Sequence, residues 1–180
     1  MRKLMLLMCV TVVLPLASMA QSVLGIEFGS SYEVVKKALQ KRYGSYEVRE
    51  ENGELHIYGD LQMGGFYFGH ALFSFQRSAT NTYFNYARFE KRYGLNEIEK
   101  VKRERDLLFS LLKDKYEDTA IPYIDDAGFK GYLFGDNPKD EEFYLGSIYV
   151  SRDENRKGEM SLWINLSYGP IYYLPKSSDF

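Results

Sequence analysis

Cysteine is almost absent from this chain of 180 residues. Cys9 is the only one, and it lies in an apolar segment near the N-terminus. A chain with one thiol forms no internal disulfide, and the residues after Cys9 offer no thiolate for a metal site or for nucleophilic catalysis. The fold must therefore rest on a hydrophobic core, and the chain is long enough to build one.

The motifs of several enzyme classes are also missing. No serine lies in a Gly-x-Ser-x-Gly elbow, and no glycine-rich phosphate loop joins a strand to a helix. The two histidines, His56 and His70, approach each other if their strands pair, but no His-x-x-x-His or Glu-x-x-His pattern supplies a third zinc ligand. We therefore predict no catalytic residue, no metal, no cofactor and no enzymatic activity.

Charge of one sign is not concentrated anywhere. The 25 acidic and 23 basic residues are mixed along the chain, so there is neither the basic face typical of nucleic-acid binding nor a polybasic membrane segment. No apolar run after residue 20 approaches the length of a membrane span. We therefore expect that the protein has no nucleic-acid partner and that it is not an integral membrane protein.

The N-terminus has the pattern of an export signal. Arg2 and Lys3 precede an almost wholly apolar stretch over residues 4–16, and Ser18 and Ala20 place small residues at −3 and −1 of a cleavage site. Residues 1–20 are thus predicted to be a cleaved signal peptide of a periplasmic or secreted protein. Cys9 is too close to Met1 for a lipoprotein signal, so we do not expect lipidation.

Two segments of the chain share one pattern of apolar spacing. Val34, Val35, Ala38, Leu39 and Tyr43 are spaced as Leu107, Leu108, Leu111, Leu112 and Tyr116, and an aromatic Gly-Asp motif follows each set. The spacing predicts a helix in each segment, and antiparallel strands separated by turn residues follow both helices. The expected fold class is α+β, with two tandem helix-plus-strand modules over residues 21–94 and 95–180, packed as one unit with both helices on one face of the sheet.

Aromatic residues are abundant, with 16 Tyr, 12 Phe and 1 Trp. They favour a sheet with a wide, partly exposed surface. In residues 160–168 the apolar residues alternate with polar ones, which places Trp163 opposite the predicted core face. Exposed Trp, Tyr and Arg are the residue types enriched in interface hot spots. The same alternation predicts an open face for partner binding made of Trp163, Tyr149, Tyr86, Arg88, Phe84 and Phe73, although these rings could instead be half-buried against each other or under the C-terminal tail.

Residues 25–44 carry a Gly-x-Ser turn, a Glu-x-Val-x-x-x-Leu helix and a closing Tyr-Gly. This segment resembles the module of the β-lactamase-inhibitor-protein-like fold and of small outer-membrane assembly lipoproteins. The resemblance implies two modules whose helices lie behind one open sheet, with the other sheet face contacting a protein partner. It supplies no functional residue, because no matching functional motif is present.

Two classes of binding function and one of catalysis follow. The leading hypothesis is an exported non-catalytic protein that binds another protein or an envelope component through the aromatic face. The alternative is binding of a small ligand or glycan, which predicts a concave groove with an aromatic floor and nearby Asn or Asp side chains. A hydrolase is the third possibility and predicts a pocket that joins two titratable groups with shifted pKa values.

Overall fold

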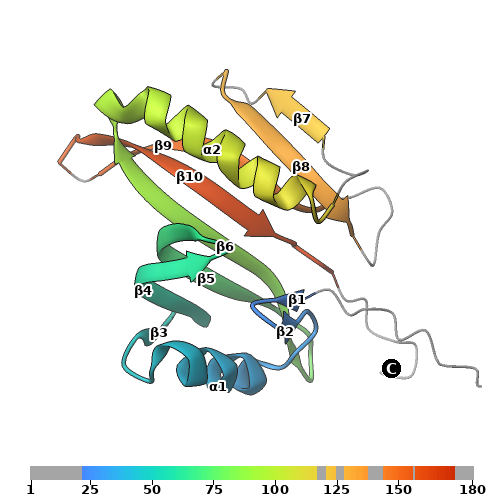
Figure 1. Cartoon of the computed structure of the whole chain (residues 1–180). Coiled ribbons are helices and arrows are strands. Elements are labelled where there is room, and N and C mark those ends of the chain that lie inside the picture. The colour runs from blue at the N-terminus through green and yellow to red at the C-terminus, as the bar shows by residue number, and fades with distance from the viewer. Residues whose placement is uncertain (1–21, 117–120, 125–127, 138–143, 156, 173–180) are drawn as a thin grey trace, which may run out of the picture.

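The computed structural model of the protein describes residues 22–116, 121–124, 128–137, 144–155 and 157–172 (Figure 1). The predicted signal peptide lies outside these described residues. The elements within them, in chain order, are β1 (Ser22–Val23), β2 (Ile26–Glu27), α1 (Tyr32–Tyr43), β3 (Val48–Glu51), β4 (Glu54–Met63), β5 (Phe66–Arg77), β6 (Thr82–Gly94), the 3-10 turn η1 (Leu95–Glu97), α2 (Ile98–Lys113), β7 (Ile121–Ile124), β8 (Lys130–Asp136), β9 (Tyr144–Glu154) and β10 (Met160–Tyr168).

Eight of these strands form one antiparallel sheet in the order β3-β4-β5-β6-β10-β9-β8-β7, while β1 and β2 pair separately. The predicted fold class, α+β with two tandem helix-plus-strand modules, is therefore wrong. The described residues are mostly strand, with two α-helices, and their large sheet is continuous. The cause is the pairing of β6 with β10, from Ala87↔Tyr168 to Gly94↔Ser161, which joins the two predicted halves at the sheet centre.

Local sequence explains the elements of the first half. The helix α1 buries Val35 and Leu39 on one stripe and ends at Gly44, whose φ of 100° suits a residue without a Cβ. The hairpin between β3 and β4 turns at Asn52 and Gly53, where φ is 54° and 82°. Positive φ at both central residues is the requirement of a type I′ turn, and Asn-Gly is its preferred sequence.

The hydrophobic core lies between the sheet and the helices. On β10, Leu162, Ile164 and Leu166 are at most 1% exposed and face this core, as their alternation predicted. Val101 and Leu108 of α2 join the same buried cluster as the stripe of α1. Both helices thus cover one face of the sheet, and none of the described helices covers the other, which we call the open face (Figure 1).

A bulge in β6 shifts the side-chain alternation of that strand. Ser74 pairs with Tyr86 and Phe75 pairs with Phe84, so Asn85 is an extra residue with no partner on β5. Its carbonyl instead accepts a hydrogen bond from the backbone N–H of Ile171 at 2.9 Å. Because the extra residue reverses the alternation, residues on the two sides of a bulge exchange faces.

No helix in the part of the chain that the structure describes has the length and apolar character needed to cross a membrane.

Candidate functional site

Five polar and aromatic side chains form one row across the open face. The strand registers align Tyr58 with His70, His70 with Glu90, Glu90 with Asn165, and Asn165 with Tyr149. The row therefore crosses β4, β5, β6, β10 and β9 in that order. Neighbours in such a row stand about 4.5–5.5 Å apart at Cβ and interact directly. The continuous sheet brings together residues that two separate modules would have kept apart.

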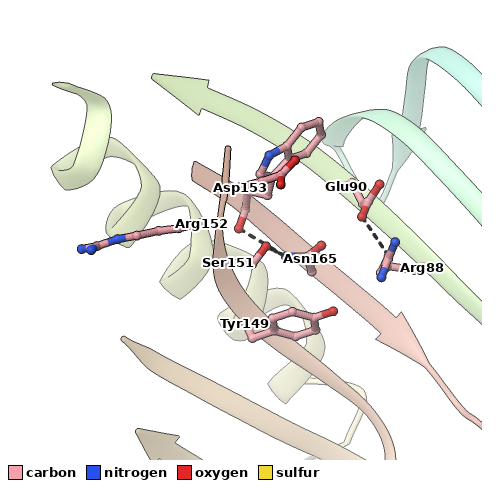
Figure 2. Close-up of a pocket in the computed structure, with 8 residues that line it drawn as sticks. Arg88, Glu90, Tyr149, Ser151, Arg152, Asp153 and Asn165 are labelled. Atoms are coloured by element: carbon pink, nitrogen blue, oxygen red, sulfur yellow. Dashed lines mark hydrogen bonds and ion pairs between the residues drawn. The ribbon is translucent and has the colours of Figure 1, made fainter. Parts of the chain in front are cut away.

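A hollow of about 450 Å³ lies at the β6–β10–β9 end of this row. Figure 2 shows Tyr149, Ser151, Asn165, Arg88 and Glu90 converging around it, while Arg152 extends away. The guanidinium of Arg152 lies 5.1 Å from the Phe129 ring centroid, on the core side of the sheet. The lining is completed by side chains from the same three strands, and in full it is Arg88, Glu90, Tyr149, Ser151, Arg152, Asp153, Trp163 and Asn165.

Hydrogen bonds fix the β10 wall of the hollow. The indole N–H of Trp163 donates to Ser161 Oγ at 3.0 Å, which sets the orientation of the ring. The amide Nδ2 of Asn165 donates to Ser151 Oγ at 2.9 Å and to the Trp163 carbonyl at 3.3 Å. Asn165 is only 2% exposed, so these bonds hold its amide in one orientation. These two bonds use the amide N–H groups of Asn165, which also lines the hollow.

An ion pair forms the β6 wall. Arg88 Nε lies 2.8 Å from Glu90 Oε1, but this contact is an ion pair and not a hydrogen bond, because Nε has no hydrogen-bond partner among the described residues. Burial lowers the pKa of Arg88, while Glu90, Tyr86 and Tyr149 raise it by more, so its pKa is raised overall. Arg88 thus stays cationic, and its Nε–H is not used as a hydrogen-bond donor.

Burial raises the pKa of the Tyr86 hydroxyl most, and the neighbouring Tyr149 raises it further. Arg88 and Ser167 lower this pKa, but by less, so it is raised overall. Tyr86 is therefore a neutral hydroxyl beside the Arg88 guanidinium.

Glu90 is anchored from its other side by a histidine. His70 Nδ1 lies 2.5 Å from Glu90 Oε2, and His70 Nε2 lies 3.0 Å from His56 Nδ1. Burial raises the pKa of Glu90, but the His70 hydrogen bond and the charges of Arg88 and the histidines lower it by more, so its pKa is lowered overall. Glu90 is a held, ionised acceptor at the edge of the hollow.

The structure brings together four of the six predicted binding residues. Trp163, Tyr149, Tyr86 and Arg88 lie on the open face, partly buried, around or beside the hollow. Trp163 is half-buried, which agrees with the half-buried state that the sequence left open as the alternative to an exposed ring.

The prediction for Phe73 and Phe84 is wrong, because both are fully buried in the core. Phe84 changes face because of the extra residue Asn85. Phe73 pairs with Ala87 across β5 and β6 and therefore shares its core face.

Sequence reasoning missed Asn165, Glu90 and Ser151 as members of this site. All three follow from the alternation that identified their neighbours, because Asn165 stands two residues after Trp163, Glu90 two after Arg88, and Ser151 two after Tyr149. Aromatic and arginine residues drew attention to the strands, and the polar residues on the same face were not included. The approach of His56 to His70, expected if their strands pair, is confirmed.

The described residues contain no group of three or more His, Cys, Asp or Glu side chains placed to hold a metal ion.

Glu90 makes stability depend on pH in a defined direction. A carboxylate whose pKa is lowered by folding stabilises the native state above its unfolded value, 4.5, and this contribution is lost as pH falls through the lower folded value. We expect Glu90→Gln to be less stable than the parent at pH about 7 by about 1–3 kcal/mol, since it removes a buried charged partner. The difference should shrink in acid. Urea unfolding at several pH values measures it.

The control for this series is Glu27→Gln, an exposed carboxylate on β2. It should leave the pH dependence unchanged. A Glu90→Gln protein with the parental stability at neutral pH would contradict the anchoring role of Glu90.

Comparisons with protein-family models, with curated proteins and with solved structures find no match to this chain. The resemblance to the β-lactamase-inhibitor-protein-like fold stays a prediction.

Proposed function

We propose that this protein is an exported, non-catalytic binding protein whose open sheet face binds a glycan in the hollow. The observation that carries the proposal is the lining itself: Trp163 and Tyr149 supply ring surface, while Asn165, Arg88 and Asp153 supply hydrogen-bonding groups beside those rings. A sugar ring has the matching chemistry. Its C–H groups pack on the negative face of an aromatic ring, and its hydroxyls both donate and accept hydrogen bonds.

The charges of the hollow favour a largely neutral ligand over a polyanion. Arg88 is paired with Glu90, and Arg152 extends away from the hollow (Figure 2). Asp153 is then the remaining charged group of the lining, and the Arg92 guanidinium lies next to the lining, 5.8 Å from the Trp163 ring centroid. A strongly anionic ligand in the hollow would meet the Asp153 carboxylate, and like charges placed together are unfavourable.

The same electrostatics favour binding over catalysis. A general acid or base works best when its pKa lies near the operating pH. Here the pKa of Glu90 is lowered and that of Arg88 is raised, so each group is held in its charged form by the other. A carboxyl group that acts as the general acid of a hydrolase would need a pKa shifted in the opposite direction, upward.

A protein partner is the second candidate. It is favoured by the exposed end of the polar row, where Tyr58 is 40% exposed and the Arg49 guanidinium lies 5.1 Å from its ring centroid. Tyrosine and arginine of this kind are common interface anchors. The proposed glycan occupies only the hollow at one end of the row. A protein partner would instead cover both the hollow and the exposed Tyr58 at the other end.

Trp163→Ala tests the glycan proposal. The parent, screened at pH about 8 against immobilised mono- and oligosaccharides, should bind a defined subset, and titration with the best soluble sugar should quench Trp163 emission. Trp163→Ala should weaken that affinity at least about tenfold by isothermal titration calorimetry, since it removes the central ring. The matched control is Tyr67→Ala, which removes a ring that is 52% exposed and lies outside the hollow. Absence of any sugar binding by the parent, or equal binding by both variants, overturns the proposal.

A further inference from the structure

His56 and His70 face each other in line on the open face. The distance between His56 Nδ1 and His70 Nε2 is 3.0 Å, the ring centroids are 5.3 Å apart, and the ring planes differ by 15°. Two nearly coplanar rings with this separation direct the facing nitrogens at each other. That is the geometry of a linear hydrogen bond, in which one nitrogen donates and the other accepts.

The contact between the rings limits how many protons the pair can hold. Two neutral imidazoles carry two ring protons, which satisfy the pair when His56 Nδ1 donates to His70 Nε2 and His70 Nδ1 donates to Glu90. A third proton fits on His56 Nε2, which faces Glu54 Oε2 at 3.7 Å. A fourth would place N–H groups on both facing nitrogens, 3.0 Å apart, with no acceptor between them. The array therefore accommodates one added proton and excludes a second.

The surroundings of the pair favour the single added charge. Tyr58 stacks on His70 with ring centroids 4.6 Å apart, and on His56 at 6.0 Å. The aromatic face and the two carboxylates stabilise one imidazolium, while Arg88 and Arg49 oppose a second positive charge. The charged and titratable groups around the pair, by strand, are Arg49 and Glu51 of β3, Glu54 and Tyr58 of β4, and Arg88 and Glu90 of β6.

Glu90 connects this array to the hollow. One of its carboxylate oxygens meets His70 Nδ1 and the other meets Arg88 Nε, and the side chain lines the hollow. If His70 moves away from a protonated His56, its charged contact with Glu90 pulls the carboxylate with it. The Arg88–Glu90 pair, which forms the β6 wall, is then disrupted.

We infer that the His56–His70 pair is an acid-sensitive device of the binding hollow: uptake of a second proton separates the rings, displaces Glu90 and disorganises the β6 wall. The ligand role of the hollow rests on the proposed function, but the acid response belongs to the protein alone. The hollow is organised for binding at neutral pH and loses this organisation in acid. Each opening of the histidine pair takes up one proton. Once most molecules are open, the fraction of molecules with an organised hollow therefore falls by up to about tenfold for each further pH unit of acidification.

The protein reports on this change through its single tryptophan, Trp163, which lines the hollow. The parent and His56→Gln are compared without ligand between about pH 7.5 and about pH 5, the range in which histidine ordinarily titrates. The amide that this substitution introduces can accept from a protonated His70, so the variant takes up its proton without opening. We expect Trp163 emission to change in the parent and to stay constant in His56→Gln.

Histidine side-chain NMR over the same pH range gives a second readout. In the parent, the two rings should take up their protons in separate steps, with Trp163 emission following the second step. Both proteins are first shown to be folded at pH about 7.5 by urea unfolding. Constant Trp163 emission in the parent, an equal change in His56→Gln, or independent protonation of the two rings each overturns the inference.

The two proposals fail in distinguishable ways. Sugar binding is measured at pH about 8, where the array is intact, so its absence contradicts the glycan proposal and leaves the acid response to be read from Trp163. A pH-insensitive Trp163 together with firm sugar binding contradicts the acid-sensitive device alone.

Discussion

Gly146→Ala should destabilise the protein by about 3 kcal/mol or more. Overpacking of a core usually costs about 1–3 kcal/mol, and the cost is highest where the surrounding atoms cannot move. A Cβ at Gly146 of β9 would overlap the backbone oxygen of Ser167 and would lie 2.5 Å from Phe134 Cζ. The first contact is with the backbone of β10, which is hydrogen-bonded on both sides, and the second is with a fully buried ring. Urea unfolding followed by circular dichroism measures the change.

Gly69→Ala is the matched control for this substitution. Gly69 also lies within a strand, β5, and neither glycine has a positive φ. A Cβ at Gly69 would have no heavy atom of the described residues within 4 Å, apart from those of its chain neighbours. Alanine there should be neutral or stabilising by about 0.5 kcal/mol, because glycine is unfavourable within a strand. Equal effects at the two positions would show that close packing of β9 on β10 does not restrict Gly146.

Phe84→Ala should cost about 3–5 kcal/mol of stability, the usual range for truncating a buried phenylalanine. The Phe84 ring stacks on Phe28 with centroids 4.8 Å apart and an interplanar angle of 11°, and it also contacts Phe73 and Phe75 at 6.0 Å. Because Phe84 lies on the core face, this loss should leave the proposed sugar binding of the remaining folded protein unchanged. Thermal unfolding and calorimetric titration at pH about 8 measure the two effects separately.

Tyr46→Ala is the control for ring removal, since Tyr46 is 97% exposed. It should change stability by no more than about 0.5 kcal/mol. If Phe84→Ala abolished sugar binding while the protein remained stable, Phe84 would have to contribute to the open face, contrary to its burial.

The sequence predicted the strands better than it predicted their partners. Turn residues at the ends of aromatic and apolar runs predict strands at residues 66–76, 82–93 and 158–168, close to the observed β5, β6 and β10. Turn residues and alternation are local properties of the sequence. The pairing of residue 87 with residue 168 is set by the global arrangement of the core. For this reason the strands were found and the continuous sheet was not.

The candidate site was predicted in part for the same reason. Trp163, Tyr149 and Arg88 follow from unbroken alternation in β10, β9 and the second half of β6. The bulge at Asn85 is one residue long and has no distinctive sequence. Strict alternation therefore predicts Phe84 on the open face, whereas it lies on the core face. Asn85 is held by Ile171, a residue after the last strand, and this long-range bond is not visible in the sequence of β6 itself.

The position of β10 also determines when the large sheet can be completed during synthesis of the chain. β10 is the last strand of the described chain, yet it occupies the middle of the sheet, between β6 and β9. While the chain is being synthesised, β6 and β9 each present an unpaired edge until residues 160–168 emerge. Such edges are sites of misassociation between chains. A chain shortened before β10 would lose more than its final strand: the two halves of the sheet would separate, and each would expose a long edge that nothing else in the described chain covers.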